Sequence, residues 1–122
     1  DVVIATKVGY DFYSHGDERR GQREIPQDFT ATYSRGACEE SLRRLRTDHL
    51  DLWQLHAILE PDEPARIFAK GGAIEAAEEA KRKGLCRFVG FTGHKDPKVL
   101  LEMLKHAFDP DGIMNRGTII PG

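Results

Sequence analysis

The chain has 122 residues, the composition of an ordinary globular domain and a formal net charge of −2 at pH 7, with acidic and basic residues interleaved. This pattern lacks the basic surface typical of nucleic-acid-binding proteins, and no apolar run is long enough to span a bilayer. We therefore expect neither a nucleic-acid partner nor a membrane-spanning segment, and no signal peptide is recognisable.

The two cysteines, Cys38 and Cys86, lie far apart and have no C-x-x-C spacing. Such usage favours a reduced, cytoplasmic setting over a disulfide framework, so we expect both thiols to act as small buried hydrophobic groups. His56 and His94 could form a metal pair in principle, but no third ligand accompanies them. We therefore predict no metal site.

The first half of the chain alternates between strand and helix patterns. The β-branched run at residues 2–7 predicts a strand, and the polar stretch at 10–33 predicts a long loop. A helix is expected over 34–46, with Ser34 as N-cap and with Cys38, Leu42 and Leu45 on its buried face. A second strand is predicted over 49–56.

The second half repeats the alternation. A loop over 57–72 is followed by a helix over 73–83, which Gly84 ends. A strand over 86–92 comes next, and Asp96 and Pro97 open a further helix as cap and first residue. The expected inward-facing residues of the two helices are Ile74, Ala77 and Ala80 for the first and Val99, Leu100, Met103, Leu104 and Phe108 for the second. Residues 109–122 form an atypical tail with a weak strand signal at 117–120.

Three strand–helix units in succession are the signature of an α/β fold with a parallel sheet. A complete βα barrel takes about 250 residues. We therefore predict that residues 1–122 form a partial (β/α)8 TIM-barrel domain of about three βα units. Three units cannot close, so one sheet face and two strand edges are expected to be bare, and the segment alone is expected to be marginally stable.

Two ionisable residues stand at the carboxyl tips of predicted strands: Lys7 ends the first and His56 ends the second. In a parallel barrel these tips surround one mouth, where catalytic groups gather. Together, an ammonium and an imidazole suit the polarisation and protonation of a carbonyl group. The plainer alternatives are a solvated lysine at a strand end and a histidine satisfied within the core.

Several ordered motifs make the sequence similar to the aldo-keto reductase family over residues 1 to about 108. They are I-A-T-K-V-G at 4–9, E-S-L-R-R-L at 40–45, D-H-L-D-L-W-Q-L-H at 48–56, G-A-I-E at 72–75 and R-F-V-G-F-T-G-H at 87–94. The G-F-T-G-H string at 90–94 resembles one branch of that family. The resemblance implies the third to fifth strands of the family barrel and NAD(P)H-dependent reduction of an aldehyde or ketone to an alcohol.

By this resemblance Lys7 takes the place of the family's catalytic lysine and His56 that of its catalytic histidine. The family's catalytic tyrosine and aspartate are expected on the strand that precedes Asp1. We expect Tyr10 and Tyr13 to line the mouth rather than to replace that tyrosine.

The resemblance also suggests a cofactor contact after the third strand, where the family usually presents Ser-Asn to the nicotinamide carboxamide. Thr92 and Gly93 hold those places here, followed by His94, so one side-chain contact is replaced by bare backbone. Asn115, in the atypical tail, is a further candidate for a cofactor contact. We expect NADP(H) rather than NAD(H).

The leading hypothesis is therefore a segment of a cytoplasmic carbonyl reductase acting on a small molecule, with its oligomeric state left open. A non-catalytic, cofactor-binding regulatory barrel is the main alternative, because a barrel fold does not fix function. An inactive truncated fragment is another. The lack of G-x-G-x-x-G disfavours a Rossmann nucleotide site and leaves these hypotheses untouched.

Overall fold

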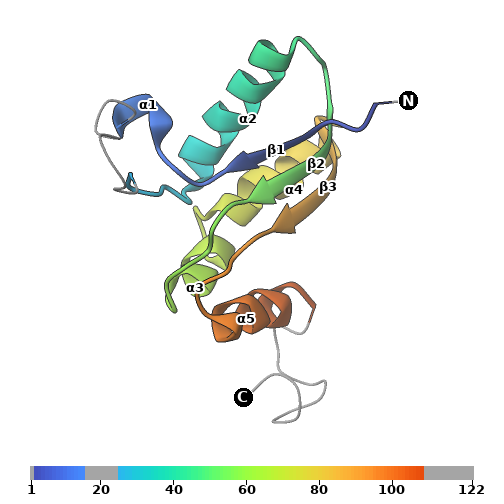
Figure 1. Cartoon of the computed structure of the whole chain (residues 1–122). Helices are drawn as coiled ribbons and strands as arrows, with labels where there is room; N and C mark the ends of the chain where they lie inside the picture. Colours follow the sequence, from blue (N-terminus) through green and yellow to red (C-terminus); the bar gives the residue numbers. More distant parts are fainter. Residues whose placement is uncertain (1, 16–24, 109–122) are drawn as a thin grey trace.

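The computed structural model describes residues 2–15 and 25–108 and contains a three-stranded parallel sheet. Its strands are β1 (Ala5–Val8), β2 (Leu50–Leu55) and β3 (Cys86–Phe91), in the order β1-β2-β3. The central strand β2 pairs with both neighbours, Lys7 lying opposite Gln54 and Gln54 opposite Gly90. All three carboxyl ends therefore meet at one edge of the sheet (Figure 1).

The helices follow the strands in the expected order. They are α1 (Phe12–His15), α2 (Ala31–Leu45), α3 (Glu63–Phe68), α4 (Ala73–Arg82) and α5 (Pro97–Phe108). Helices α2 and α4 pack side by side on one face of the sheet, and α3 and α5 contact each other beyond its carboxyl edge (Figure 1). Parallel strands joined by helical crossovers confirm the predicted α/β class. None of the helices in the described part of the chain has the length and apolar character needed to cross a bilayer.

The core lies between the sheet and the two covering helices. Trp53 and Leu55 of β2 are almost completely buried beneath them. Helix α4 turns a face of alanines inward, which lets a helix lie close to a sheet; these are Ala73, Ala76, Ala77 and Ala80. Cys38 and Cys86 are free and buried in the same cluster, so the prediction that both thiols serve as packing groups is confirmed.

The opposite face of the sheet is exposed. Strand alternation places Ala5 and Lys7 there, on the side away from the buried Val8, and both are exposed. Phe88 of β3 pairs with Leu52 of β2, which in turn pairs with Ala5, and it is 60% exposed despite its large apolar ring. Within the described residues no helix covers this face, as a partial barrel requires (Figure 1). The marginal stability of the segment stays a prediction.

Two predicted element starts are wrong. Val2 and Val3 are exposed and lie outside β1, because pairing with β2 begins only where the Ile4 carbonyl accepts from Asp51 and Leu52. Helix α2 begins at Ala31, with Thr30 as its N-cap: the Thr30 hydroxyl accepts from the Tyr33 N–H at 3.2 Å. Ser34 is therefore not the cap but a buried residue of the first turn.

The two predicted loops also contain short helices, α1 within 10–33 and α3 within 57–72. No side chain of the described residues caps α3, but local chemistry at its start favours it: Pro64 stands in its first turn, and the buried Glu63 carboxylate accepts the N–H groups of the preceding Leu59 and Glu60. Neither helix has enough residues for a periodic apolar pattern to reveal it.

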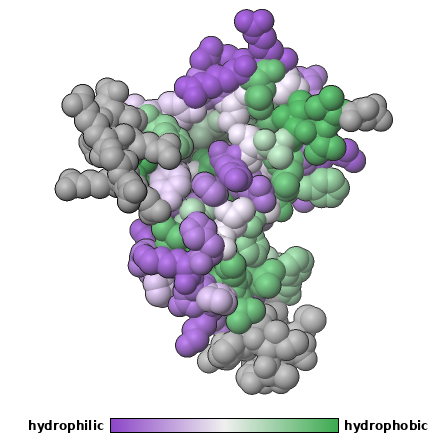
Figure 2. Space-filling model, viewed as in Figure 1, coloured by the Kyte–Doolittle hydropathy of each residue, from purple (hydrophilic) through white to green (hydrophobic). Residues whose placement is uncertain are grey.

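The predicted buried faces of two helices are too wide. Leu45 of α2 is 49% exposed, and in α5 Leu104 is 37% and Phe108 75% exposed. The buried residues of α5 are Val99 and Met103, since the helix packs on α3 rather than against the broad sheet. Hydrophobic surface consequently shows over α5 and beside the N-terminus (Figure 2). By contrast, the predicted end of one helix and the predicted start of the next are confirmed. Gly84, after α4, has a left-handed φ of 73°, and Asp96 Oδ1, before α5, accepts from the Lys98 N–H at 2.9 Å.

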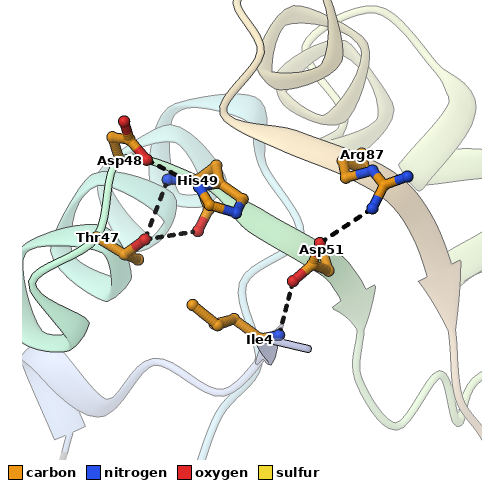
Figure 3. Close-up of polar contacts among 6 residues, drawn as sticks. All are labelled: Ile4, Thr47, Asp48, His49, Asp51 and Arg87. Atoms are coloured by element: carbon orange, nitrogen blue, oxygen red, sulfur yellow. Dashed lines mark hydrogen bonds and ion pairs between the residues drawn. The ribbon is translucent and has the colours of Figure 1, made fainter. Parts of the chain in front are cut away.

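Asp51 ties the three strands together at the amino ends of the sheet (Figure 3). Its Oδ2 accepts from the Ile4 N–H at 2.8 Å, and its Oδ1 lies 3.4 Å from Nη1 of Arg87. The hydrogen bond from Ile4 is the main reason that the pKa of Asp51 is lowered. This contact fastens β1 to β2 at the end remote from the strand tips.

Candidate active site

The carboxyl edge of the sheet brings together the residues that follow each strand. Lys7 is the next-to-last residue of β1, His56 directly follows β2, and Thr92 directly follows β3. Lys7 and His56 line one cavity of about 70 Å³ together with three tyrosines, Tyr10, Tyr13 and Tyr33. The two strand tips singled out by the sequence thus line the same small space, as do Tyr10 and Tyr13.

His56 is held by contacts on several sides. Its backbone N–H donates to the Val8 carbonyl at 2.7 Å, which continues the strand pairing beyond β2. Its Nδ1 lies 2.8 Å from the Thr92 hydroxyl oxygen. The ring of Tyr10 stands edge-on to the imidazole, with 5.8 Å between ring centroids. These contacts leave little freedom to the half-buried imidazole.

The pKa of His56 is lowered from its ordinary value. Burial is the largest cause, followed by the positive charge of Lys7 and then that of His94. All three causes disfavour the imidazolium. His56 is therefore neutral at pH 7, with one ring nitrogen protonated and the other able to accept a hydrogen bond.

The residue after His56 has a strained backbone. Ala57 adopts the left-handed region with φ 58° although it is not glycine, and it is buried. Such a conformation costs about 1–3 kcal/mol and persists only where the surroundings fix it. Here the Ala57 N–H donates to Thr92 Oγ1 at 3.0 Å, and Nε2 of Gln27 donates to the Ala57 carbonyl at 2.8 Å and the His56 carbonyl at 3.1 Å.

Two glycines let other segments approach this turn closely. A Cβ on Gly9 would stand 2.7 Å from the His56 carbonyl oxygen, and one on Gly93 would stand 2.7 Å from Cδ2 of Leu100 and 2.8 Å from the Ile58 carbonyl oxygen. A side chain at either place would push the strand tips apart. Gly93 is therefore a packing requirement of the edge, whatever else it does.

The predicted cofactor contacts are placed in part. Thr92, Gly93 and His94 follow β3 at the same edge, and His94 is exposed. Asn115 and the whole atypical tail, 109–122, lie outside the described residues. No cluster of metal-ligating side chains occurs in the part of the chain that the structure describes.

Sequence reasoning missed Gln27 and the role of Ala57. Gln27 sits in the stretch that was expected to be a featureless loop, and a lone glutamine carries no pattern that marks it. Tyr33, whose hydroxyl donates to the Tyr10 carbonyl at 2.7 Å, was missed for the same reason. Burial is the main cause that raises the pKa of Tyr33 to about 12, so it remains a neutral donor.

A larger cavity of about 430 Å³ lies between the amino ends of α2 and α4. Lys70 and Arg66 line it, and Arg66 is already paired with Asp62 at 3.1 Å. Lys7 and His56 are not among its lining residues. We therefore assign the candidate site to the smaller cavity, where the ionisable strand tips meet.

The chain is similar in sequence to known proteins. The sequence model of the Aldo/keto reductase family matches residues 1–116. The oxidoreductase YqkF of Bacillus subtilis, itself described as uncharacterized, is 33% identical over 105 residues, which is 86% of this chain and 30% of that protein. L-galactose dehydrogenase of Arabidopsis thaliana is 33% identical over 93 residues, 76% of this chain and 24% of the dehydrogenase.

Solved structures agree with the sequence relatives. The holo form of the aldo-keto reductase AKR11C1 from Bacillus halodurans superposes with a TM-score of 0.66 at 37% identity, over 86% of this chain and 31% of that one. A further aldo-keto reductase structure, from Pseudomonas aeruginosa, gives a TM-score of 0.57 at 28% identity over 75% of this chain and 32% of its own. The chain thus spans roughly a third or less of these proteins.

Proposed function

This chain belongs to the aldo/keto reductase family, and from that premise we propose that it supplies the lysine and histidine side of the active site of an NAD(P)H-dependent carbonyl reductase. The observation that carries the proposal is the shared cavity of Lys7 and His56 at the strand tips. Oxidoreductases among the relatives support the same reaction class. The substrate class is a small aldehyde or ketone.

In this proposal the neutral His56 donates a hydrogen bond to the carbonyl oxygen of the substrate and orients it. The ammonium of Lys7 provides a positive charge beside the same space. That charge lowers the pKa of a neighbouring phenol, the proton donor that the family resemblance places on the strand preceding Asp1. Protonation of the substrate oxygen then becomes feasible near neutral pH.

A reduced nicotinamide would supply the hydride for the carbonyl carbon. The Thr92 hydroxyl fits its carboxamide: it accepts from the Ala57 N–H and contacts His56, which leaves one lone pair for an amide N–H. Gly93 offers no side chain, and the packing of Leu100 excludes one. Of the Ser-Asn pair usual in the family, only the hydroxyl function is preserved here.

NADP(H) rather than NAD(H) is proposed from the family resemblance, as are the cofactor contacts of His94 and Asn115. The cytoplasmic location is proposed from the two free, buried thiols. Steady-state kinetics of the full-length protein with each of the two reduced cofactors test the first point.

The activity itself is tested by carbonyl-dependent oxidation of NADPH in the full-length protein. We expect Lys7→Met and His56→Gln each to lower kcat by more than about 100-fold, which corresponds to about 2.7 kcal/mol of barrier. Lys98→Met, which removes an exposed lysine of α5, is the matched control and leaves kcat unchanged. A Lys7→Met variant that keeps kcat within about tenfold of the wild type removes Lys7 from the reaction.

The regulatory alternative makes the opposite prediction. A non-catalytic barrel binds the dinucleotide without turning over any aldehyde or ketone, so the wild-type protein itself would show binding and no oxidation. Fluorescence titration with NADPH beside the turnover assay separates the two functions.

A further inference from the structure

The backbone and the side chain of Thr92 are both hydrogen-bonded within the carboxyl edge of the sheet. An amide N–H can only donate, so the Ala57 N–H occupies one lone pair of the Thr92 hydroxyl oxygen. The backbone of Thr92 is also engaged: its N–H donates to the Leu55 carbonyl at 2.9 Å, and its carbonyl accepts from the Ile58 N–H at 2.8 Å. The side-chain oxygen is thereby fixed relative to the tip of β2.

The hydroxyl hydrogen of Thr92 still needs an acceptor. Among residues 2–15 and 25–108, the only acceptor in hydrogen-bond contact with this hydroxyl is Nδ1 of His56, at 2.8 Å. If Nδ1 carried the ring proton instead, the oxygen would accept twice and its own hydrogen would have no partner in the described structure. A half-buried hydroxyl is better satisfied when it donates.

We propose that Thr92 is a positioning residue that holds His56 as the Nε2–H tautomer, through a chain from the Ala57 N–H to the Thr92 hydroxyl to Nδ1 of His56. Nε2 makes no hydrogen bond to any residue in the described ranges, so its N–H is available to a ligand. This inference rests on the proposed function for its purpose: a donor at Nε2 is what orientation of a carbonyl oxygen requires. The tautomer itself is a property of the folded protein and exists without substrate.

The strained backbone at Ala57 supports the same series of hydrogen bonds. Gln27 takes no part in the chemistry. Its side-chain amide donates to the carbonyls of His56 and Ala57 and thereby keeps Ala57 in the left-handed region. That conformation aims the Ala57 N–H at Thr92 Oγ1. Thr92 and Gln27 therefore hold the turn through different backbone groups, and the Ala57 N–H occupies one lone pair of the Thr92 hydroxyl, as the tautomer assignment requires.

The test is two-bond ¹H–¹⁵N correlation spectroscopy of the histidine rings in the ¹⁵N-labelled full-length protein, above the pKa of free histidine. Comparison with His56→Gln assigns the His56 signals. We expect a single Nε2–H tautomer in the wild type, the same tautomer in Thr92→Ser, and a mixture of both tautomers in Thr92→Val. Thr92→Val keeps the side-chain shape and the hydrogen bonds of the residue's own backbone. It removes the hydroxyl, which accepts from the Ala57 N–H and contacts Nδ1 of His56.

Kinetics of the same variants connect the tautomer to the reaction. Thr92→Val is expected to lower kcat by roughly tenfold, and Thr92→Ser to restore it to within about twofold. An Nδ1–H signal for His56 in the wild type overturns the inference, and so does a Thr92→Val protein that folds and retains the pure Nε2–H tautomer. Should Thr92→Val fail to fold, the wild-type spectrum alone decides. A pure Nε2–H tautomer in a protein without carbonyl reductase activity would overturn the proposed function and leave the tautomer assignment standing.

Discussion

The ring of Tyr10 stands edge-on to the imidazole of His56, with 5.8 Å between their centroids and an angle of 73° between their planes. Such aromatic pairs contribute about 0.5–1.5 kcal/mol beyond the area they bury. Because Tyr10 directly follows the Gly9 that approaches the His56 carbonyl, the pair forms one wall of the cavity. The orientation of His56 thus depends on the loop after β1 as well as on Thr92.

Replacement of this ring should disturb the reaction moderately. We expect Tyr10→Leu to lower kcat by about three- to tenfold, since the edge contact that orients the imidazole is lost. Tyr10→Phe keeps the ring and should stay within about twofold of the wild type. If Phe proves as damaging as Leu in the NADPH oxidation assay, the hydroxyl rather than the ring edge is the important group.

Gly93 should not tolerate the asparagine that the family usually carries there. A Cβ at this position meets Leu100 at 2.7 Å and the Ile58 carbonyl at 2.8 Å. Overpacking of this kind costs about 1–3 kcal/mol, so Gly93→Ala and Gly93→Asn are both expected to destabilise the protein. Urea denaturation measures the free energy of unfolding.

Gly36, in the exposed part of α2, is the matched control. Apart from its own helix backbone and chain neighbours, no atom of the described residues lies within 4 Å of a Cβ built on it, so Gly36→Ala is expected to stabilise the protein by about 0.5–1 kcal/mol through helix propensity. A Gly93→Ala protein as stable as the wild type would mean that α5 can shift away from the strand tip.

Glu63 fastens the chain that leaves the candidate site. Its buried carboxylate accepts the N–H of Leu59 at 2.7 Å and that of Glu60 at 3.0 Å. Glu63→Ala leaves both N–H donors without this acceptor and should cost about 1–3 kcal/mol in the free energy of unfolding. Glu63→Gln keeps an acceptor oxygen and should cost less. Equal losses for both variants would show that the negative charge itself is needed.

Asp51 should make the stability of the sheet depend on acid. Its pKa is lowered in the folded state, chiefly by the hydrogen bond from the Ile4 N–H and with a contribution from Arg87. A lowered carboxyl pKa stabilises the fold above the unfolded pKa of about 3.9, and this stabilisation is lost as the pH falls through the folded pKa. Thermal melts between pH 6 and 2.5 should therefore fall less steeply for Asp51→Asn than for the wild type. Parallel melting curves for the two proteins would contradict this assignment.

His56 should also lower stability as the pH falls, but over a higher pH range than Asp51. Its folded pKa is lowered from the ordinary value of about 6.5, so well above pH 6.5 both states are neutral and the group has no effect. As the pH falls below 6.5 the unfolded chain gains a proton first, and stability decreases until the folded pKa is passed. His56→Gln should remove this component of the loss between pH 7 and 5. A wild-type protein whose stability rises over that range would indicate a raised pKa instead.

Much of the fold follows from local sequence. The alternation of apolar runs with helical periodicity predicts three βα units, Gly84 ends a helix because it accepts a positive φ, and Asp96 with Pro97 starts one. The ordered motifs around Lys7 and His56 further identify the family. These signals are short in range, and each can be read from neighbouring residues alone.

The arrangement of the site is decided by tertiary structure. The hydroxyl of Thr92 reaches His56 across 36 positions of sequence, and the amide of Gln27 reaches the His56 carbonyl across 29. The parallel register of the three strands places their carboxyl tips at one edge of the sheet. The left-handed backbone of Ala57, φ 58°, occurs at that edge and depends on contacts with residues distant in sequence. Periodicity states which side of an element is apolar; it cannot state which distant hydroxyl completes a hydrogen bond, because that depends on how separate elements are fixed against one another.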